Sequence, residues 1–311
     1  MTRKNSKISI VIPIFNSEKT IEQLVNRLVG ILPQPLEIVL SNDGSRDDSD
    51  AVCRALQKKY PHIVVYVELS KNYGEHGAVM AGLTHSTGDY VVIMDDDFQN
   101  PPEEVLKLVD EAREHNHDVV YSAYPVKNDS WFRNLASRLN GFMATILLKK
   151  PRGLYLSSFK CMNRFLVDEI LKYTGPYPYV DGLIFRVTDR FGVVEVKHDK
   201  RTEGESGYTL RKLLRLYMNM FVNFSLLPLR CSTFLGFIVT FFSLIFSVYI
   251  FFSKLLNPDM PAGWATTVIL ISFFAGVQLV VLGLAGEYVG RIFLSQNKTP
   301  QFCVRNIYKG E

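Results

Sequence analysis

Three consecutive aspartates are the residues of this chain with the clearest potential for chemistry. Asp95, Asp96 and Asp97 follow the apolar run 90–94, and Gln99 adds a neutral oxygen two residues further on. Carboxylates this close repel one another unless a cation or hydrogen-bond donors neutralise them. A ligand set made only of oxygen favours a hard ion, Mg²⁺ or Mn²⁺, which can hold a phosphate group at the same time. The alternative is an acidic turn that water solvates without an ion.

The elements that must position these aspartates alternate between strand and helix patterns. Apolar, β-branched runs predict buried strands at 8–15, 36–41, 63–67, 90–94 and 119–122. Helix-start residues lie between the strands, and Asn16 with Ser17 is expected to begin the first helix. This alternation is typical of an α/β layer with a mainly parallel sheet.

Polar side chains gather where the predicted strands end. Asn16 and Glu18 follow the first strand, Asp43 follows the second, and the aspartate run follows the fourth. Ligands bind beyond the carboxyl ends of strands in such sheets, so we expect a site for a phosphorylated ligand here. The sequence has no Walker lysine motif, and segment 74–77 (GEHG) lacks the dinucleotide glycine fingerprint. We expect His76 within it to be a loop or cap residue rather than a ligand.

Two segments near the end of the chain are long and apolar enough to cross a membrane. Residues 231–253 and 260–286 contain no charged side chain, and about 20 apolar residues span the hydrocarbon core as a helix. The flanking basic residues are Arg211, Lys212, Arg215 and Arg230 before them, and Arg291, Lys298, Arg305 and Lys309 after them. This distribution predicts a two-span hairpin with both ends in the cytoplasm. Two buried helices of a soluble core are the alternative.

Charge and cysteine usage argue against several classes of protein. The net charge of +4 is too small to indicate a nucleic-acid partner, and none is expected. The four cysteines form no CxxC pair, which argues against a zinc knuckle or a disulfide framework and suits a reducing compartment. The basic start, residues 1–7, lacks the apolar core of a signal peptide, so no cleaved leader is expected.

Several motifs spread over nearly the whole chain carry a resemblance to one family. They are VIPIFN at 11–16, NDGS at 42–45, NYG at 72–74, DDDFQNPPE at 95–103, Arg201 with GES at 204–206, and GEYVGR at 286–291. Together they resemble the family 2 glycosyltransferases of the GT-A fold, in the polyprenyl-phosphate branch. That branch includes dolichyl-phosphate mannose synthases, bactoprenol glucosyltransferases and undecaprenyl-phosphate formamidoarabinose transferases.

The resemblance and the hydropathy pattern together imply four parts of the chain. Residues 1–208 would form a cytoplasmic GT-A catalytic domain, Rossmann-like with a mainly parallel sheet. Residues 209–230 would form a juxtamembrane amphipathic helix, 231–290 two transmembrane helices, and 291–311 a cytoplasmic tail. Residues 131–148 have the composition of an interfacial helix, with an ordinary packed amphipathic helix as the alternative. The resemblance also implies a homo-oligomer, often a tetramer, in the bacterial inner membrane.

The resemblance also implies roles for particular residues. The nucleotide pocket would be lined by Pro13, Phe15, Asn16, Glu18 and Asp95, with Asp43 at the base edge. The catalytic metal would be held by Asp95, Asp97 and Gln99. The lipid phosphate would be bound by Arg133 and Ser137, and the loop closing over the phosphates would carry Arg201 and Ser206.

Two positions depart from the pattern of the family. Ser158 and Lys160 stand where relatives often carry an acidic residue and an arginine, so a catalytic or sugar-binding carboxylate is absent from that loop. Asp181 is our predicted catalytic substitute, with a helix cap as the alternative. Gly207 stands where relatives have a lysine, so one cation of the closing loop is lost.

The expected reaction is a metal-dependent, inverting transfer of one sugar. The donor would be a nucleotide-sugar, UDP-linked by resemblance, and the acceptor undecaprenyl or another polyprenyl phosphate, for decoration of lipopolysaccharide, O-antigen or another surface glycan. A phosphate monoester is mostly dianionic at pH 7, so it needs cationic positioning, which Arg133 and Arg201 could give, more than a strong base. The alternatives are a processive polysaccharide synthase, whose Gln-x-x-Arg-Trp motif is absent here, a catalytically inactive membrane scaffold of the same fold, and a flippase subunit.

Overall fold

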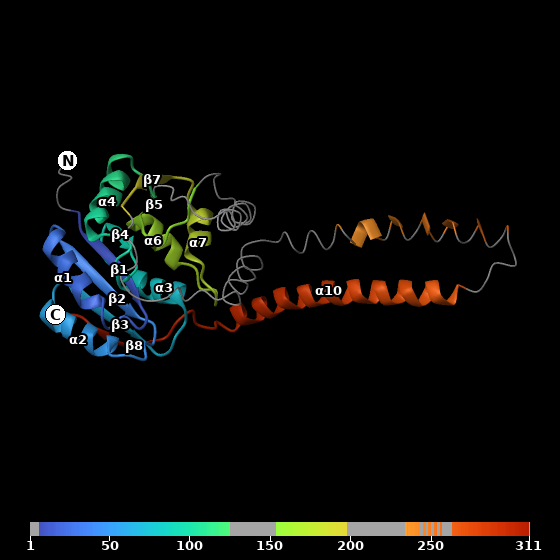
Figure 1. The fold of residues 1–311 in the computed structure, drawn as a ribbon, viewed down its shortest axis with the longest axis horizontal. Coiled ribbons are helices and arrows are strands. Elements are labelled where there is room, and N and C mark those ends of the chain that lie inside the picture. The colour runs from blue at the N-terminus through green and yellow to red at the C-terminus, as the bar shows by residue number, and fades with distance from the viewer. Residues whose placement is uncertain are drawn as a thin grey trace. The chain divides into compact units, whose positions relative to one another are not determined.

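The computed structural model describes residues 6–124, 154–197 and 263–310, with short helical stretches between 234 and 256. The chain divides into two compact units. One consists of Met1–Thr209 together with Lys298–Glu311, and the other of Leu210–Asn297. Figure 1 labels the helices and strands of both units.

The first unit is built on one eight-stranded sheet with the order β7-β5-β6-β4-β1-β2-β3-β8. The strands are β1 Ile8–Ile14, β2 Leu36–Asn42, β3 Val64–Leu69, β4 Tyr90–Ile93, β5 Val119–Ala123, β6 Lys160–Asn163, β7 Phe191–Glu195 and β8 Val304–Tyr308. β1 pairs in parallel with β2 and β4, β2 with β3, and β5 with β7. β6 is antiparallel to β4 and β5, and β8 is antiparallel to β3. The sheet is therefore mixed around a parallel centre.

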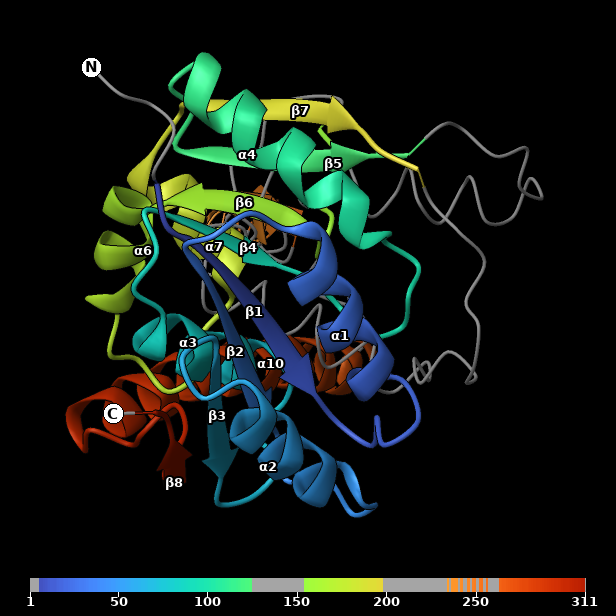
Figure 2. The ribbon, with the colours of Figure 1, turned by 90° about the vertical axis from the view of Figure 1, so that its left-hand side faces the viewer.

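Helices cover both faces of this sheet (Figure 2). One face carries α1 Ile21–Ile31, α2 Ser49–Lys59 and α4 Val105–Glu114, with the short turn η1 Pro102–Glu104 leading into α4. The other face carries α3 Glu75–His85, α6 Arg164–Leu171 and α7 Val180–Val187. Because both faces are covered, the central strands consist mainly of buried apolar residues, as the sequence pattern indicates.

The core explains why the first strand and first helix form where they do. Ile10, Ile12 and Ile14 alternate along β1 and pack in one buried cluster with Leu24 and Leu28 of α1. All five side chains have no exposed surface. Burying each such side chain contributes roughly 1.5–3 kcal/mol, so this interface holds the end of β1 in a fixed position.

The five predicted strands are all present, but the predicted start of the first helix is wrong. Asn16 has a φ of 56°, in the left-handed region, and so lies outside the helix. The carbonyl oxygen of Ser17 accepts hydrogen bonds from the amides of Thr20 and Ile21, each at 3.2 Å, and α1 begins at Ile21. Residues 16–20 therefore form a loop at the end of β1, which leaves their polar groups available to neighbouring loops.

The last residues of the chain return to this sheet. The sequence pattern predicts a tail at 291–311, whereas Val304–Tyr308 forms the edge strand β8 beside β3. The Tyr308 ring stacks on Tyr66, with 5.4 Å between centroids, and the Arg54 guanidinium lies 4.8 Å from the Tyr308 centroid. Asn306 Nδ2 donates to Glu68 Oε2 at 2.8 Å. Side-chain contacts thus reinforce the backbone pairing.

The second unit contains α10, Trp264–Gln296, a helix of 33 residues, which is about 50 Å long at 1.5 Å per residue. Its segment Phe273–Gln296 is the one helix in the described part of the chain that is long and apolar enough to cross a membrane, with a mean hydropathy of 1.5. Large apolar side chains along it, such as Leu279 and Val280, are exposed. The predicted first span, 231–253, is described only in fragments, and 131–148 and 209–230 lie outside the described residues.

Candidate active site

Three loops meet at the carboxyl edge of β1, β2 and β4. The Asn16 amide donates to Ser45 Oγ at 3.0 Å, and the Arg46 amide donates to Asn16 Oδ1 at 2.9 Å, which joins the first loop to the second. The hydroxyl of Ser17 donates to Asp96 Oδ2, which joins the first loop to the third. The loops that carry the predicted site residues are therefore linked into one assembly.

Asp43 is buried at the end of β2, where only 3% of its surface is exposed. Its two carboxylate oxygens accept the backbone amides of Tyr73 at 2.6 Å and Gly74 at 2.9 Å, just before α3. Burial raises the pKa of the Asp43 carboxyl above its usual range, and these two N–H donors oppose the rise. Asp43 thus fixes the loop that leads into α3, and its predicted contact with a nucleotide base stays a prediction.

The residue after Asp43 must be glycine for this arrangement. Gly44 has a φ of 66°, and a Cβ there would lie 2.8 Å from the backbone nitrogen of Asn72. We expect Gly44→Ala to cost about 1–3 kcal/mol because it combines an unfavourable backbone conformation with this clash. Gly30, within α1 and with open space around it, is the matched control, since Gly30→Ala should be neutral or stabilise by up to about 1 kcal/mol. Thermal unfolding of the two variants checks this, and an equal effect at both positions would contradict it.

The other residues predicted for the nucleotide pocket divide into two groups. Asn16 and Glu18 accept hydrogen bonds from the second loop, Glu18 Oε2 taking the Asp48 amide at 3.0 Å. Pro13 is half-buried, and Phe15 has 48% of its surface exposed at the end of β1. Asn16 and Glu18 therefore organise the loops, whereas the aromatic ring of Phe15 is left exposed and its contact with a nucleotide stays a prediction.

The three aspartates after β4 have different partners. Asp95 Oδ2 accepts from Ser158 Oγ at 2.6 Å, and Asp97 Oδ1 accepts from the Gln99 amide at 3.0 Å. Asp96 Oδ2 is turned to Ser17 on the first loop. Neighbouring aspartates of this run therefore have different partners, and the hydrogen bond of Asp96 to Ser17 connects the first loop to the third.

Burial and neighbouring carboxylates disfavour the charged form of two carboxyl groups in this run. Burial, and then the nearby carboxylates, raise the pKa of Asp95 and that of Asp96 to about 6, although hydroxyl groups of Ser158 and Ser17 act in the opposite direction. Glu75 and Asp97 are among the charges that raise the pKa of Asp95. An all-oxygen site with several carboxylates close together fits a hard divalent cation.

A buried ion pair lies beside the aspartates. Lys160 Nζ pairs with Asp181 Oδ1, which also accepts from the Tyr121 hydroxyl at 3.0 Å. Only 4% of the Lys160 side chain and 10% of the Asp181 side chain are exposed. The positive charge of Lys160 also acts to lower the pKa of Asp95. The N-cap of α7 is Tyr179, so Asp181 does not cap the helix; it holds this ion pair, and its catalytic role stays a prediction.

His76 closes the cluster from the start of α3. Its ring contacts Tyr179 edge-on, with 4.9 Å between centroids, and burial lowers its pKa to about 4. The ring is therefore neutral at pH 7. His76 lies inside the first turn of α3, whose N-cap is Gly74, and not in a loop or at the cap as expected. No sequence motif marks the hydrogen bonds made by Ser17 and Tyr121. Tyr73 belongs to the NYG motif, which gave no sign of its contact with Asp43. Arg133, Ser137, Arg201 and Ser206 lie outside the described residues.

This sheet, with acidic loops at its carboxyl edge, defines the GT-A class of fold. A solved structure of that class, the glucosyl-3-phosphoglycerate synthase of Mycobacterium tuberculosis in complex with Mn²⁺, UDP and glucosyl-3-phosphoglycerate, superimposes with a TM-score of 0.52. The match covers 70% of this chain and 78% of that one, at 19% identity. The family model described as "Glycosyl transferase family 2" matches residues 9–171, and the chain belongs to this family.

Curated relatives extend the similarity over the whole chain. The "Undecaprenyl-phosphate 4-deoxy-4-formamido-L-arabinose transferase" of Edwardsiella ictaluri is 34% identical over 312 residues, covering 97% of this chain and 94% of that protein. The protein of the same description from Serratia proteamaculans is 33% identical with the same coverage. The prediction of a glycosyltransferase similar to the polyprenyl-phosphate branch is confirmed.

Proposed function

We propose that this glycosyltransferase moves a single sugar from a nucleotide-sugar to undecaprenyl phosphate or a similar polyprenyl phosphate, with inversion at the anomeric carbon. The observation that carries the proposal is the aspartate run after β4, which is tied to Ser17 on one side and to Ser158 on the other. The activity for which the relatives from Edwardsiella and Serratia are named supports the acceptor.

The donor would bind across the carboxyl edge of β1, β2 and β4. Phe15 offers an exposed ring to the nucleotide base, beside Pro13 and the loops organised by Asn16 and Glu18. Asp95, Asp97 and Gln99 would hold Mg²⁺ or Mn²⁺, an ion that neutralises the charge of the leaving diphosphate. The similar mycobacterial synthase was crystallised with Mn²⁺ and UDP, which supports this choice of ion and nucleotide.

The acceptor phosphate can act as the nucleophile without a strong base, because its second pKa is about 6. Its positioning falls to Arg133, Ser137, Arg201 and Ser206, which stay predictions of phosphate binding. Asp181 stays a predicted catalytic residue. Its contacts with Lys160 and Tyr121 support a second role, which is to fix the start of β6 beside Asp95.

We further propose that the protein lies in the bacterial inner membrane, with the catalytic domain and both termini in the cytoplasm. The apolar segment Phe273–Gln296 of α10 supports membrane attachment. A lipid acceptor also requires the active site to lie at the membrane surface, and this requirement supports membrane attachment as well. The second span of the hairpin and the homo-oligomer, a tetramer by resemblance, are parts of this proposal.

The proposal is tested by mass spectrometry of the lipid product. Detergent-solubilised protein is incubated with undecaprenyl phosphate, Mn²⁺ and UDP- and GDP-sugars that include UDP-4-deoxy-4-formamido-L-arabinose. A mass gain of one sugar identifies the reaction and the donor together. Failure of every donor, together with failure to bind UDP or GDP, would favour the inactive scaffold and overturn the proposal.

Ser158 offers a test of how Asp95 is positioned. We expect Ser158→Ala to weaken Mn²⁺ binding about 10-fold or more, because the hydroxyl that orients the Asp95 carboxylate is removed. Ser158→Thr keeps the hydroxyl and should retain most of the affinity. Titration of Mn²⁺ by electron paramagnetic resonance, with UDP present, measures this directly. Equal affinities for the alanine and threonine variants would show that the hydrogen bond has no such role.

A further inference from the structure

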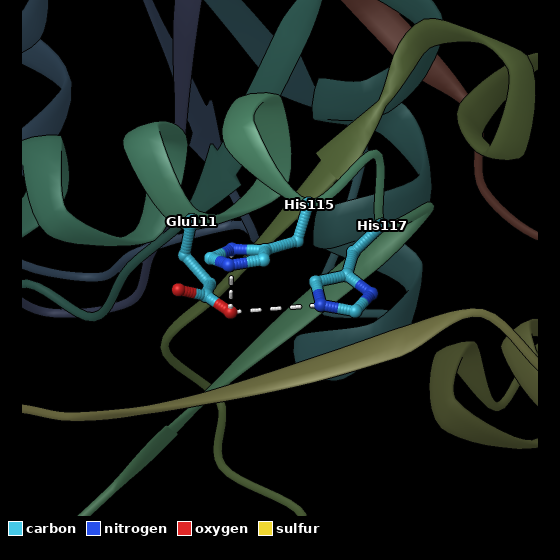
Figure 3. Close-up of side chains that lie close together, drawn as sticks. All are labelled: Glu111, His115 and His117. Atoms are coloured by element: carbon cyan, nitrogen blue, oxygen red, sulfur yellow. Dashed lines mark ion pairs between the residues drawn. The ribbon is translucent and has the colours of Figure 1, made fainter.

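A second group of metal-ligand side chains lies at the C-terminal end of α4 (Figure 3). Glu111 and His115 are four residues apart and so share one face of the helix, and His117 lies in the turn that leads to β5. Glu111 Oε1 is 3.2 Å from His115 Nδ1 and 3.5 Å from His117 Nε2. One ligand atom from each residue lies within 4.8 Å of the other two.

We propose that Glu111, His115 and His117 bind one divalent transition-metal ion of the zinc class. A tetrahedral ion with bonds of about 2.0–2.2 Å separates its ligand atoms by roughly 3.3–3.6 Å. The distances from Glu111 Oε1 to the two ring nitrogens, 3.2 and 3.5 Å, are close to this separation. Two imidazoles and one carboxylate select Zn²⁺, Co²⁺, Ni²⁺ or Cu²⁺ rather than Mg²⁺.

The fourth ligand of the ion would be water. More than half of the His115 side chain is exposed, whereas Glu111 and His117 are about three-quarters covered. The cluster is thus open on the His115 side and backed by protein on the other. An ion held by three protein groups with one open position is a common arrangement for zinc.

The neighbouring backbone is shaped around the His117 ring. Gly192 of β7 faces it, and a Cβ at this position would lie 2.6 Å from His117 Cδ2 and 3.1 Å from Nε2. The His117 amide donates to the Ala112 carbonyl at 3.0 Å, which returns the turn to the end of α4. The partial negative charge at that helix terminus favours a cation. Because Gly192 leaves space for the ring and the turn positions its backbone, His117 lies close to Glu111 before any ion binds.

This cluster is separate from the aspartate site. β4 and β5 both run antiparallel to β6 and so point the same way. Asp95 follows the carboxyl end of β4, whereas His117 precedes the amino end of β5, and a five-residue strand spans about 16 Å. An ion at Glu111 therefore takes no part in sugar transfer. It would instead cross-link α4 to the start of β5 and stabilise the fold when it binds.

The experiment titrates Co²⁺ into the full-length, tag-free protein in the presence of excess Mg²⁺, which occupies sites made only of oxygen. We expect one Co²⁺ per chain, with the visible absorption bands of nitrogen-ligated tetrahedral cobalt, and displacement of these bands by Zn²⁺. His115→Ala and His117→Ala should each weaken Co²⁺ binding at least about 10-fold. His62→Ala, at an exposed histidine before β3, is the matched control and should bind like the parent protein.

Two further variants distinguish the loss of a metal ligand from misfolding of the protein. Glu111→Gln keeps the shape of the side chain, and should weaken binding while circular dichroism and transferase activity are unchanged. Gly192→Ala keeps all three ligands but crowds the His117 ring, so it should also weaken binding. The proposal is overturned if the parent protein shows no cobalt bands in excess Mg²⁺. It is also overturned if the bands persist in the folded Glu111→Gln protein with both histidines replaced.

Discussion

Asp97→Asn is expected to lower the rate of sugar transfer by a factor on the order of 10³, because a charged oxygen facing the donor diphosphate is lost. The asparagine oxygen can still accept the hydrogen bond that the Gln99 amide makes to Asp97 Oδ1. The loop should therefore keep its geometry, and the loss should reflect charge alone. Product formation is measured by mass spectrometry with the sugar donor that the parent protein uses.

Asp96→Asn is the matched control for this prediction. Asp96 is adjacent in sequence, but its carboxylate accepts from Ser17, and an asparagine oxygen can do the same. We expect transfer to fall less than about 10-fold in this variant. Titration of Mn²⁺ should follow the same order, with weaker binding in Asp97→Asn than in Asp96→Asn. Equal losses in the two variants would contradict the different roles that the structure gives these aspartates.

Lys160→Met is expected to destabilise the catalytic unit by about 3–5 kcal/mol, because it leaves the Asp181 carboxylate buried without its counter-charge. Only 4% of the Lys160 side chain and 10% of the Asp181 side chain are exposed, so water cannot take the place of the lysine. A loss of this size lowers the midpoint of thermal unfolding by on the order of 10 °C. Transfer should fall as well, because Lys160 lies two residues after Ser158, which contacts Asp95.

An exposed ion pair provides the control for Lys160. Lys172 pairs with Glu169, and 68% of its side chain is in contact with solvent. Lys172→Met should change stability by less than about 1 kcal/mol. The double variant Lys160→Met/Asp181→Asn removes both charges and keeps an acceptor for Tyr121. Its unfolding midpoint should recover much of the loss, and a midpoint as low as that of Lys160→Met would exclude the buried charge as the cause.

The central strands could be predicted because burial on both faces leaves a clear apolar pattern. The run at 8–15 is continuous for this reason, and the strand ends at Ile14, within one residue of the prediction. β6 gives no such signal, because Lys160–Asn163 is four residues long and contains a lysine whose charge is neutralised only in the folded protein. β8 follows an apolar helix and gains its partners from β3, far away in the sequence.

The sequence predicted which types of residue form the candidate site, but it did not predict the contacts between their side chains. Oxygen ligands after β4 and polar groups after β1 and β2 indicate a phosphate-binding edge, and the three loops do meet there. The sequence could not show that Asp96 bonds to Ser17, or that Ser158 bonds to Asp95. Those contacts join residues more than sixty positions apart, and short-range patterns carry no information about them.

The return of the chain to its first sheet restricts how it can be threaded through a bilayer. β3 and β8 are neighbours in one sheet, and α10 lies between them in the sequence. A segment whose two ends are fixed to the same folded body on one side of a membrane must cross that membrane an even number of times. The proposed hairpin of two spans meets this condition. The pairing of a five-residue edge strand with β3 thus supports the proposed even number of crossings.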